Sequence, residues 1–179
     1  MACIKNLSAD ITYDCADFTS IGGTGEIDEA IIINSSDISA ISESWGTGTI
    51  TMLTGKKGYV ANSVNNSIMY QDAIKVNDTT PPGEDQSVVL KVLRQGVLTD
   101  YRIVINQLLG GNFRVAFKSK TGKYFLAGAF CGLEASDLAT DSSTGGISTV
   151  TLKTPEASTG DKLVTLTKAE YEGLKIPKV

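Results

Sequence analysis

Carboxylates are the side chains with the most chemical potential in this chain, because its 179 residues include no histidine. Histidine is the commonest general base, the commonest metal ligand and the usual activator of a serine or cysteine nucleophile. The nearest acidic pairs are Asp28 with Glu29 and Glu84 with Asp85. Adjacent residues on a strand point to opposite faces, and acids in a loop are solvated, so neither pair predicts an acid/base dyad. We therefore expect a protein that is not an enzyme, and a carboxylate hydrolase or lyase ranks last among the functions considered.

Two further motifs also fail as ligand sites. Asp137 and Asp141 lie among small residues, but the glycine and closing glutamate of a calcium loop are missing. The glycine-rich residues 22–25 precede a predicted strand and no Lys-Ser or Lys-Thr follows them, which is the wrong context for a phosphate loop. The sequence predicts no cofactor and no metal site.

The three cysteines, Cys3, Cys15 and Cys131, are widely spaced and form no ligand-spaced pair. Their odd number excludes a complete intramolecular disulfide framework, although one bridge plus one free thiol stays open. Small buried hydrophobic residues are the favoured interpretation.

Composition sets the class of protein. Hydrophobic residues make up 41% of the chain and charged residues 20%, with a net charge of −4 and a pI near 4.8. This balance predicts one folded domain, argues against a protein that grips nucleic acid through a basic face, and contains no apolar run that could cross a membrane. The first ten residues lack the apolar core of a secretion signal, so we expect intracellular synthesis, with a mature form that has lost such a signal as the alternative. We expect residues 1–25 to form an N-terminal arm and residues 26–179 a single β-rich domain.

Apolar periodicity predicts a mainly β fold, a β-sandwich or half-barrel with one packed α-helix. The strands are expected at residues 26–33, 49–53, 68–76, 88–94, 112–119, 124–128, 147–153 and 162–166. The helix would be capped by Thr99 and would bury Tyr101, Val104, Ile105 and Leu108. Residues 167–174 suit a capped C-terminal turn of helix. Residues 77–85 are expected to form a loop, because two prolines cannot donate to a strand ladder.

Residues 38–66 contain the only tryptophan, Trp45, and are punctuated by glycines. The favoured interpretation is a surface hairpin whose aromatic residues hold it to the body. The alternative is an extended hairpin that reaches a neighbouring subunit, with Trp45, Thr49, Met52 and Tyr59 as contacts.

The hairpin at residues 112–128 carries a family resemblance. Phe113, Val115 and Phe117 alternate with polar or small residues, and Thr121-Gly122 supplies the tight turn before Tyr124-Phe125-Leu126-Ala127-Gly128. With the preceding helix, the following Gly132-Leu133-Glu134 and a Thr-rich strand pair, this region resembles the C-terminal half of tail-tube proteins of bacteriophages that infect Bacteroidetes. The opening Met1-Ala2-Cys3 is similar too. The resemblance covers roughly the last 80 residues, and the first half matches only in its glycine-punctuated, strand-rich style.

The resemblance implies a virion protein that forms hexameric rings, which stack into a hollow tail tube. One sheet of each protomer would join its neighbours in an inner β-barrel, the helix would pack outside it, and a hairpin within residues 43–66 would contact the next ring. The partners would be further copies, other tail proteins and DNA that passes through the lumen without specific binding, with no membrane. Glu26, Asp28 and Glu29 are the candidate channel-lining acids. The alternative is another virion component, such as a capsid-decoration or tail-fibre module.

Overall fold

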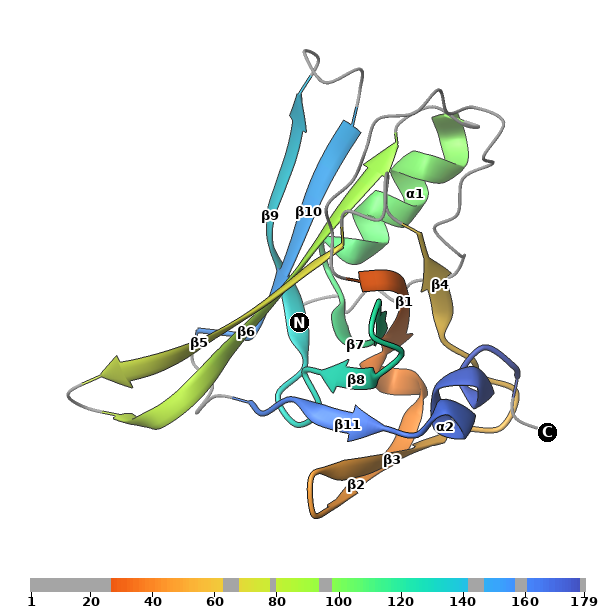
Figure 1. The fold of residues 1–179 in the computed structure, drawn as a ribbon. Helices are drawn as coiled ribbons and strands as arrows, with labels where there is room; N and C mark the ends of the chain where they lie inside the picture. The colour runs from red at the N-terminus through yellow and green to blue at the C-terminus, as the bar shows by residue number, and fades with distance from the viewer. Residues whose placement is uncertain are drawn as a thin grey trace.

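The structure is a computed structural model that describes residues 27–62, 68–77, 80–93, 98–141, 147–156 and 161–177. The predicted arm at 1–25, with Cys3 and Cys15, lies outside these residues, and so does Glu26. The fold is mainly β with a packed helix, as the periodicity predicted (Figure 1).

Eleven strands and two α-helices make up the described chain. The strands are β1 (Ile27–Asn34), β2 (Ile38–Ser44), β3 (Thr47–Met52), β4 (Tyr59–Ala61), β5 (Met69–Asn77), β6 (Thr80–Leu93), β7 (Asn112–Ser119), β8 (Tyr124–Ala127), β9 (Leu133–Asp141), β10 (Ile147–Lys153) and β11 (Val164–Leu166). The helices are α1 (Leu98–Leu108) and α2 (Lys168–Gly173), and a short 3-10 turn, Ser35–Asp37, joins β1 to β2.

The strands form one mixed sheet in the order β2-β3-β11-β8-β7-β9-β10-β6-β5, with β1 paired to both β4 and β7. The sheet branches at β7. On one edge of β7, Phe113 pairs with Leu133 of β9, while Val115 to Lys118 pair with β8. One branch therefore runs to the β2–β3 hairpin and the other to the β5–β6 hairpin.

Strand β1 separates two hydrophobic cores. Ala30 and Ile32 point into the first core, whereas Ile31 and Ile33 point into the second. All four are fully buried, because the sheet is covered on both faces at its centre. The first core contains α1, β6 and β10, and the second contains β3, β11 and α2.

Helix α1 confirms three of the four positions of the predicted amphipathic stripe, and the side chain of Tyr101 lies outside what the structure describes. Val104, Ile105 and Leu108 are buried in the first core, and Ile103 on the opposite face is half exposed. The helix begins at Leu98, so Thr99 lies inside it and does not precede it as a cap. The helix ends at Leu108 and is followed by a turn, in which the Gly110 N–H donates to the Gln107 carbonyl at 3.4 Å.

The loop predicted at residues 77–85 is wrong, since β6 begins at Thr80 and pairs with β5. The pairing shifts register between Lys75 and Asn77, opposite Pro81 and Pro82. A bulge tolerates proline because the ladder is already interrupted there. Moreover, β10 pairs with β6 only from Ser87 onward, so the prolines lie where β6 has a single neighbour.

The sheet contains strands that local pattern did not predict. The strands β2, β4 and β9 were not among the strands expected. The other predicted strands are confirmed within one or two residues, apart from the earlier start of β6, and Thr167 caps α2 by accepting the Glu170 N–H at 3.2 Å. Of the residues that the structure describes, none belongs to a helix long and apolar enough to cross a membrane.

Candidate functional site

The two ends of the sheet are the first candidate for function. Within the described residues, β2 pairs only with β3, and β5 pairs only with β6. Each end strand therefore presents one row of backbone N–H and C=O groups without a strand partner. Such rows readily pair with another chain unless the protein covers them.

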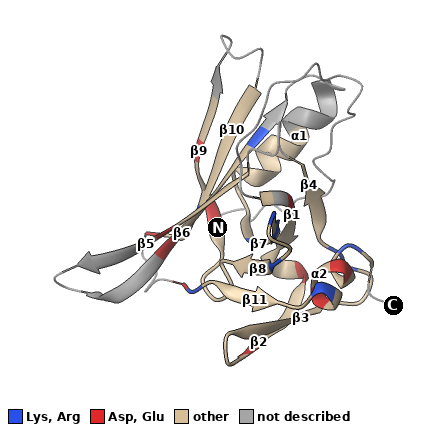
Figure 2. Ribbon diagram, in the orientation of Figure 1, with Lys and Arg blue, Asp and Glu red and all other residues tan. Residues whose placement is uncertain are grey.

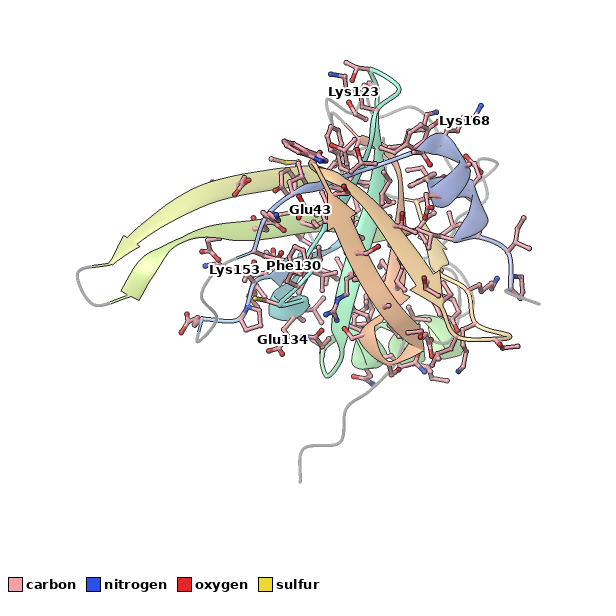
Figure 3. The ribbon with its side chains drawn as sticks, turned by 90° about the horizontal axis from the view of Figure 1, so that it is seen from below. Glu43, Lys123, Phe130, Glu134, Lys153 and Lys168 are labelled. Carbon is pink, nitrogen blue, oxygen red and sulfur yellow. The ribbon has the colours of Figure 1, made fainter. Side chains whose placement is uncertain are left out.

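The β5–β6 hairpin forms an arm that projects from the body (Figures 1 and 3). Gln71, Asp72 and Ala73 are consecutive in β5 and all exposed, so both faces of the arm are open to solvent there. Met69, at its base, is also exposed, at 55%. An isolated two-stranded ribbon is marginally stable in water. The arm thus has the geometry of an element that is completed by a partner.

The β2–β3 hairpin ends in a turn that exposes Trp45 completely, at 102% of its reference surface. Ser44 pairs with Thr47, which leaves Trp45 and Gly46 as a two-residue loop. Their φ angles are +54° and +80°, as a type I′ turn requires. Asparagine or glycine normally occupies the first position, because positive φ strains a bulky side chain. No other described non-glycine residue has a positive φ.

Three contacts hold this turn in place. The Gly46 N–H donates to Oε1 of Glu43 at 3.1 Å, the Thr165 N–H donates to the Gly46 carbonyl at 2.9 Å, and Lys162 forms an ion pair with Glu43. The hydrogen bond from Lys162 lowers the pKa of Glu43. Trp45 is therefore presented by a fixed turn.

A second fixed turn exposes Phe130. It joins β8 to β9 through Gly128 and Gly132, whose φ angles are +70° and +76°. The buried carboxylate of Asp161 accepts the Phe130 N–H at 3.0 Å and the Cys131 N–H at 2.8 Å, and Oε1 of Gln86 accepts the Gly128 N–H at 2.8 Å. The Phe130 side chain nevertheless remains 49% exposed.

Arg114 supports the same turn from β7. Its guanidinium donates to the Phe130 carbonyl at 3.3 Å and to Oδ1 of Asn112 at 3.0 Å, and it also bonds Ser35. Burial lowers the pKa of Arg114, against the opposing effect of Asp161. This polar cluster has a structural role, because its bonds tie together the turns around the branch point of the sheet.

Lys162 links the two exposed aromatic turns. Its Nζ pairs with Glu43 beside Trp45 and lies 5.6 Å from the centroid of the Phe130 ring. Figure 3 shows Glu43 and Phe130 in the same region of the molecule. We call Trp45, Phe130, Glu43 and Lys162 the aromatic knob.

A groove of about 380 Å³ lies between β3 and α2. Its apolar lining comes from Ile50, Met52, Leu174, Ile176 and Pro177, and Thr49, Thr51, Ala169, Glu170 and Gly173 complete it. Tyr171 holds α2 in position from below, because its hydroxyl donates to Oε1 of Glu29 on β1 at 3.0 Å. We call this surface the β3–α2 groove.

The predicted contact residues fall in three places. Trp45 forms the tip of the knob. Thr49 and Met52 line the groove, although Met52 is only 6% exposed and also belongs to the second core. Tyr59 is half-buried against the first core, with Lys57 Nζ 5.8 Å from its ring centroid. It therefore packs on the body as the favoured interpretation predicted, whereas the fully exposed Trp45 does not.

The predicted inter-ring segment is a different element from the projecting arm. Residues 43–66 include the end of β2, all of β3 and β4, which lie on the body, whereas the arm is β5–β6. Of the candidate channel acids, Glu29 is engaged within the protomer by Tyr171 and by Lys175 at 2.6 Å. Asp28 lies on β1, and Glu26 is outside the described residues.

Phe130, Asp161 and Lys162 were not predicted as functional residues. Their sequence signal is weak: Gly128 and Gly132 bracket the exposed phenylalanine, but Asp161 is 30 positions from the turn that it holds. Among the residues described, no cluster of three or more His, Cys, Asp or Glu side chains could hold a metal ion.

Comparison of the chain with protein-family models, with curated proteins and with solved structures gave no match.

Proposed function

We propose that this chain is a structural subunit that completes its open sheet with copies of itself. The observation that carries the proposal is the pair of end strands, β2 and β5, each of which pairs on one side only in the part of the chain that the structure describes. Natural proteins normally shield such strands with charge, proline or a covering element. Here the base of β5 carries the exposed Met69, the uncharged Gln71 and one charged residue, Asp72, so charge shields the edge at only one of these exposed positions.

The assembly that we propose is a closed ring that stacks into a hollow tube, as in the phage tail tubes that residues 112–166 resemble. Closure around a ring satisfies both ends of every sheet, because the β2 edge of one copy can pair with the β5 edge of the next. Stacking of rings is a head-to-tail contact that does not close, so it produces a filament. The virion tail, with other tail proteins at its ends, is the proposed location.

The electrostatic balance suits a passage for DNA. A net charge of −4 disfavours tight binding of phosphates, so nucleic acid would pass without adhering. Figure 2 shows acidic positions at the base of the arm, on β5 and β6. Two acidic residues of these strands are Asp72, which is exposed, and Asp85, which is partly buried. The Asp85 carboxylate forms an ion pair with Lys153 Nζ at 3.2 Å.

Negative-stain electron microscopy of the purified protein tests this proposal. We expect rings or tubes with a central hole. Met69→Lys should reduce their number, because a lysine on an edge strand opposes pairing with another strand. Leu109→Lys is the matched control, since Leu109 is also an exposed large hydrophobic residue but follows α1 and belongs to neither end strand. Small globular particles under all solution conditions would contradict the proposal.

A further inference from the structure

We propose that Trp45 of one copy binds in the β3–α2 groove of the next copy. This inference rests on the proposed self-assembly and adds to it a specific side-chain contact between copies. It is separate from pairing of the end strands, so either contact can fail without the other.

The conformation of Trp45 is the first step. A tryptophan with φ of +54° occupies a position that asparagine or glycine would fill with less strain. Strain of this kind persists where the surrounding structure fixes it and is often found at functional sites. The Glu43, Lys162 and Thr165 contacts fix this turn. The protein thus holds its only tryptophan in water, on a rigid support.

A fixed, exposed aromatic side chain is the kind of residue that anchors protein interfaces. Burial of an aromatic side chain removes about 150–250 Å² from water, and tryptophan is among the residues most enriched at interface hot spots. Because the turn is already ordered, Trp45 would lose little conformational freedom on binding. Phe130, at 49% exposure on the other side of Lys162, extends the same apolar surface.

The groove matches this anchor in shape and chemistry. Its volume of about 380 Å³ accommodates an indole ring, and its apolar lining includes Ile176, which is 67% exposed. Gly173 has no atom within 4 Å of where a Cβ would lie, so one wall of the groove is open to a flat ring. Apolar walls with few polar groups are typical of pockets that receive an aromatic side chain.

Charge complementarity favours a second copy of this chain as the occupant. Lys162, which is paired with Glu43, lies in the knob, and Glu170, whose Oε2 accepts the Ile50 N–H at 3.3 Å, lines the groove. An incoming knob would therefore bring its lysine towards the glutamate of the groove. Because the knob of each copy enters the groove of the next copy in the series, the proposed contact is head-to-tail and can propagate along a ring or a stack.

Disulfide trapping tests the geometry. Two proteins are prepared without native cysteines (Cys3, Cys15 and Cys131 each →Ser), one carrying Ser44→Cys and the other Gly173→Cys. Ser44 is exposed beside Trp45, and Gly173 is exposed in the groove. On mixing and oxidation, we expect the covalent heterodimer to form at least about tenfold faster than with Thr121→Cys in place of Gly173→Cys, because binding raises the local thiol concentration. Thr121 is an equally exposed control at the β7–β8 turn.

Substitution in the native-cysteine chain provides the second measurement. Trp45→Ala should raise the protein concentration at half-assembly at least about tenfold, whereas Trp45→Phe should retain most of the association. If Trp45→Ala assembles like the parent and the cysteine pair shows no preference, this inference is overturned and sheet completion stands. If the parent protein itself remains monomeric at all concentrations, the proposed function fails and the inference fails with it.

Discussion

The hydroxyl of Tyr171 donates a hydrogen bond to Oε1 of Glu29 at 3.0 Å, which joins α2 to β1 across 142 positions of the chain. Tyr171 is fully buried, stacks on Tyr124 with ring centroids 4.9 Å apart, and lies beneath Lys175 Nζ at 5.1 Å. Lys175 in turn pairs with Glu29, and although burial opposes it, its hydrogen bonds to Glu29 and Glu172 raise the pKa of Lys175. This arrangement places α2 opposite β3 and so forms the groove.

Tyr171→Phe should lower the free energy of unfolding by about 1 kcal/mol, the usual net value of a buried hydrogen bond. Burial and the Glu29 charge raise the pKa of Tyr171 above its ordinary value near 10. This group therefore contributes stability that is complete below pH ~10 and is lost as the pH rises above it, because the unfolded chain ionises first. Urea unfolding at pH 8 and pH 11 should show a smaller difference between variant and parent at the higher pH.

The matched control is Tyr70→Phe, which removes an exposed hydrogen bond to Asp72 of 3.2 Å. Its unfolding free energy should change by less than about 0.5 kcal/mol, as exposed substitutions usually do. Equal effects of the two substitutions would argue against a special role for Tyr171.

Gly132→Ala should lower the free energy of unfolding by roughly 2–6 kcal/mol, because backbone strain and steric collision cost about 1–3 kcal/mol each. Gly132 has φ of +76°, and a Cβ at this position would collide with the Asn112 side chain. Gly55→Ala separates the two effects, because Gly55 has φ of +75° but no neighbouring atom within 4 Å. The midpoint of thermal unfolding of Gly132→Ala should be well below that of Gly55→Ala. Equal midpoints would contradict the close approach of Gly132 to the Asn112 side chain.

Asp161→Asn should lower the free energy of unfolding by about 1–3 kcal/mol. The carboxylate accepts three backbone N–H groups, and the substitution replaces one of its oxygens by an NH₂ group that can only donate. The same substitution should loosen the turn that carries Phe130 and increase its amide hydrogen exchange. Glu134→Gln is the control, since Glu134 is exposed and accepts only an exposed bond from Asn112 at 3.2 Å among the contacts described. Unchanged exchange at Phe130 in Asp161→Asn would refute the role given to Asp161.

Acid should release the Trp45 turn. The pKa of Glu43 in the folded protein lies below the ordinary glutamate value near 4.3 because Lys162 hydrogen-bonds its carboxylate. The contribution of Glu43 to the stability of the turn is therefore complete above pH ~4.3, and it is lost as the pH falls through the lower pKa of the folded state. The fluorescence anisotropy of Trp45, the only tryptophan, should fall over this range, and Glu43→Gln at pH 7 should resemble the parent at acid pH. An anisotropy that does not respond to pH or to Glu43→Gln would contradict this account of the turn.

The parts of the fold that the sequence predicts are those whose cause is local. Phe113, Val115 and Phe117 alternate because one face of β7 is buried, and Val104, Ile105 and Leu108 share a helix face for the same reason. Strand β6 was mispredicted at Pro81 and Pro82, because proline is tolerated there only through a bulge and a missing neighbour, and both are set by distant pairing.

The candidate site was partly predictable for the same physical reason. Trp45 is visible in the sequence as a lone tryptophan beside a glycine. The partners that fix it, Lys162 and Thr165, lie more than 100 positions away and follow from the position of β11 beside β3. Glu29 is a candidate channel acid, and within the protomer it lies between Tyr171 and Lys175, a contact that no local pattern reveals.

Hydrogen–deuterium exchange of the end strands tests most directly whether copies complete each other's sheets. The proposal predicts that amides of β2 and β5 exchange rapidly in dilute monomer and become protected in step with assembly at higher concentration, while amides of the central strand β7 stay protected throughout. Assembled particles in which the edges of β2 and β5 still exchange as fast as in the monomer would contradict it.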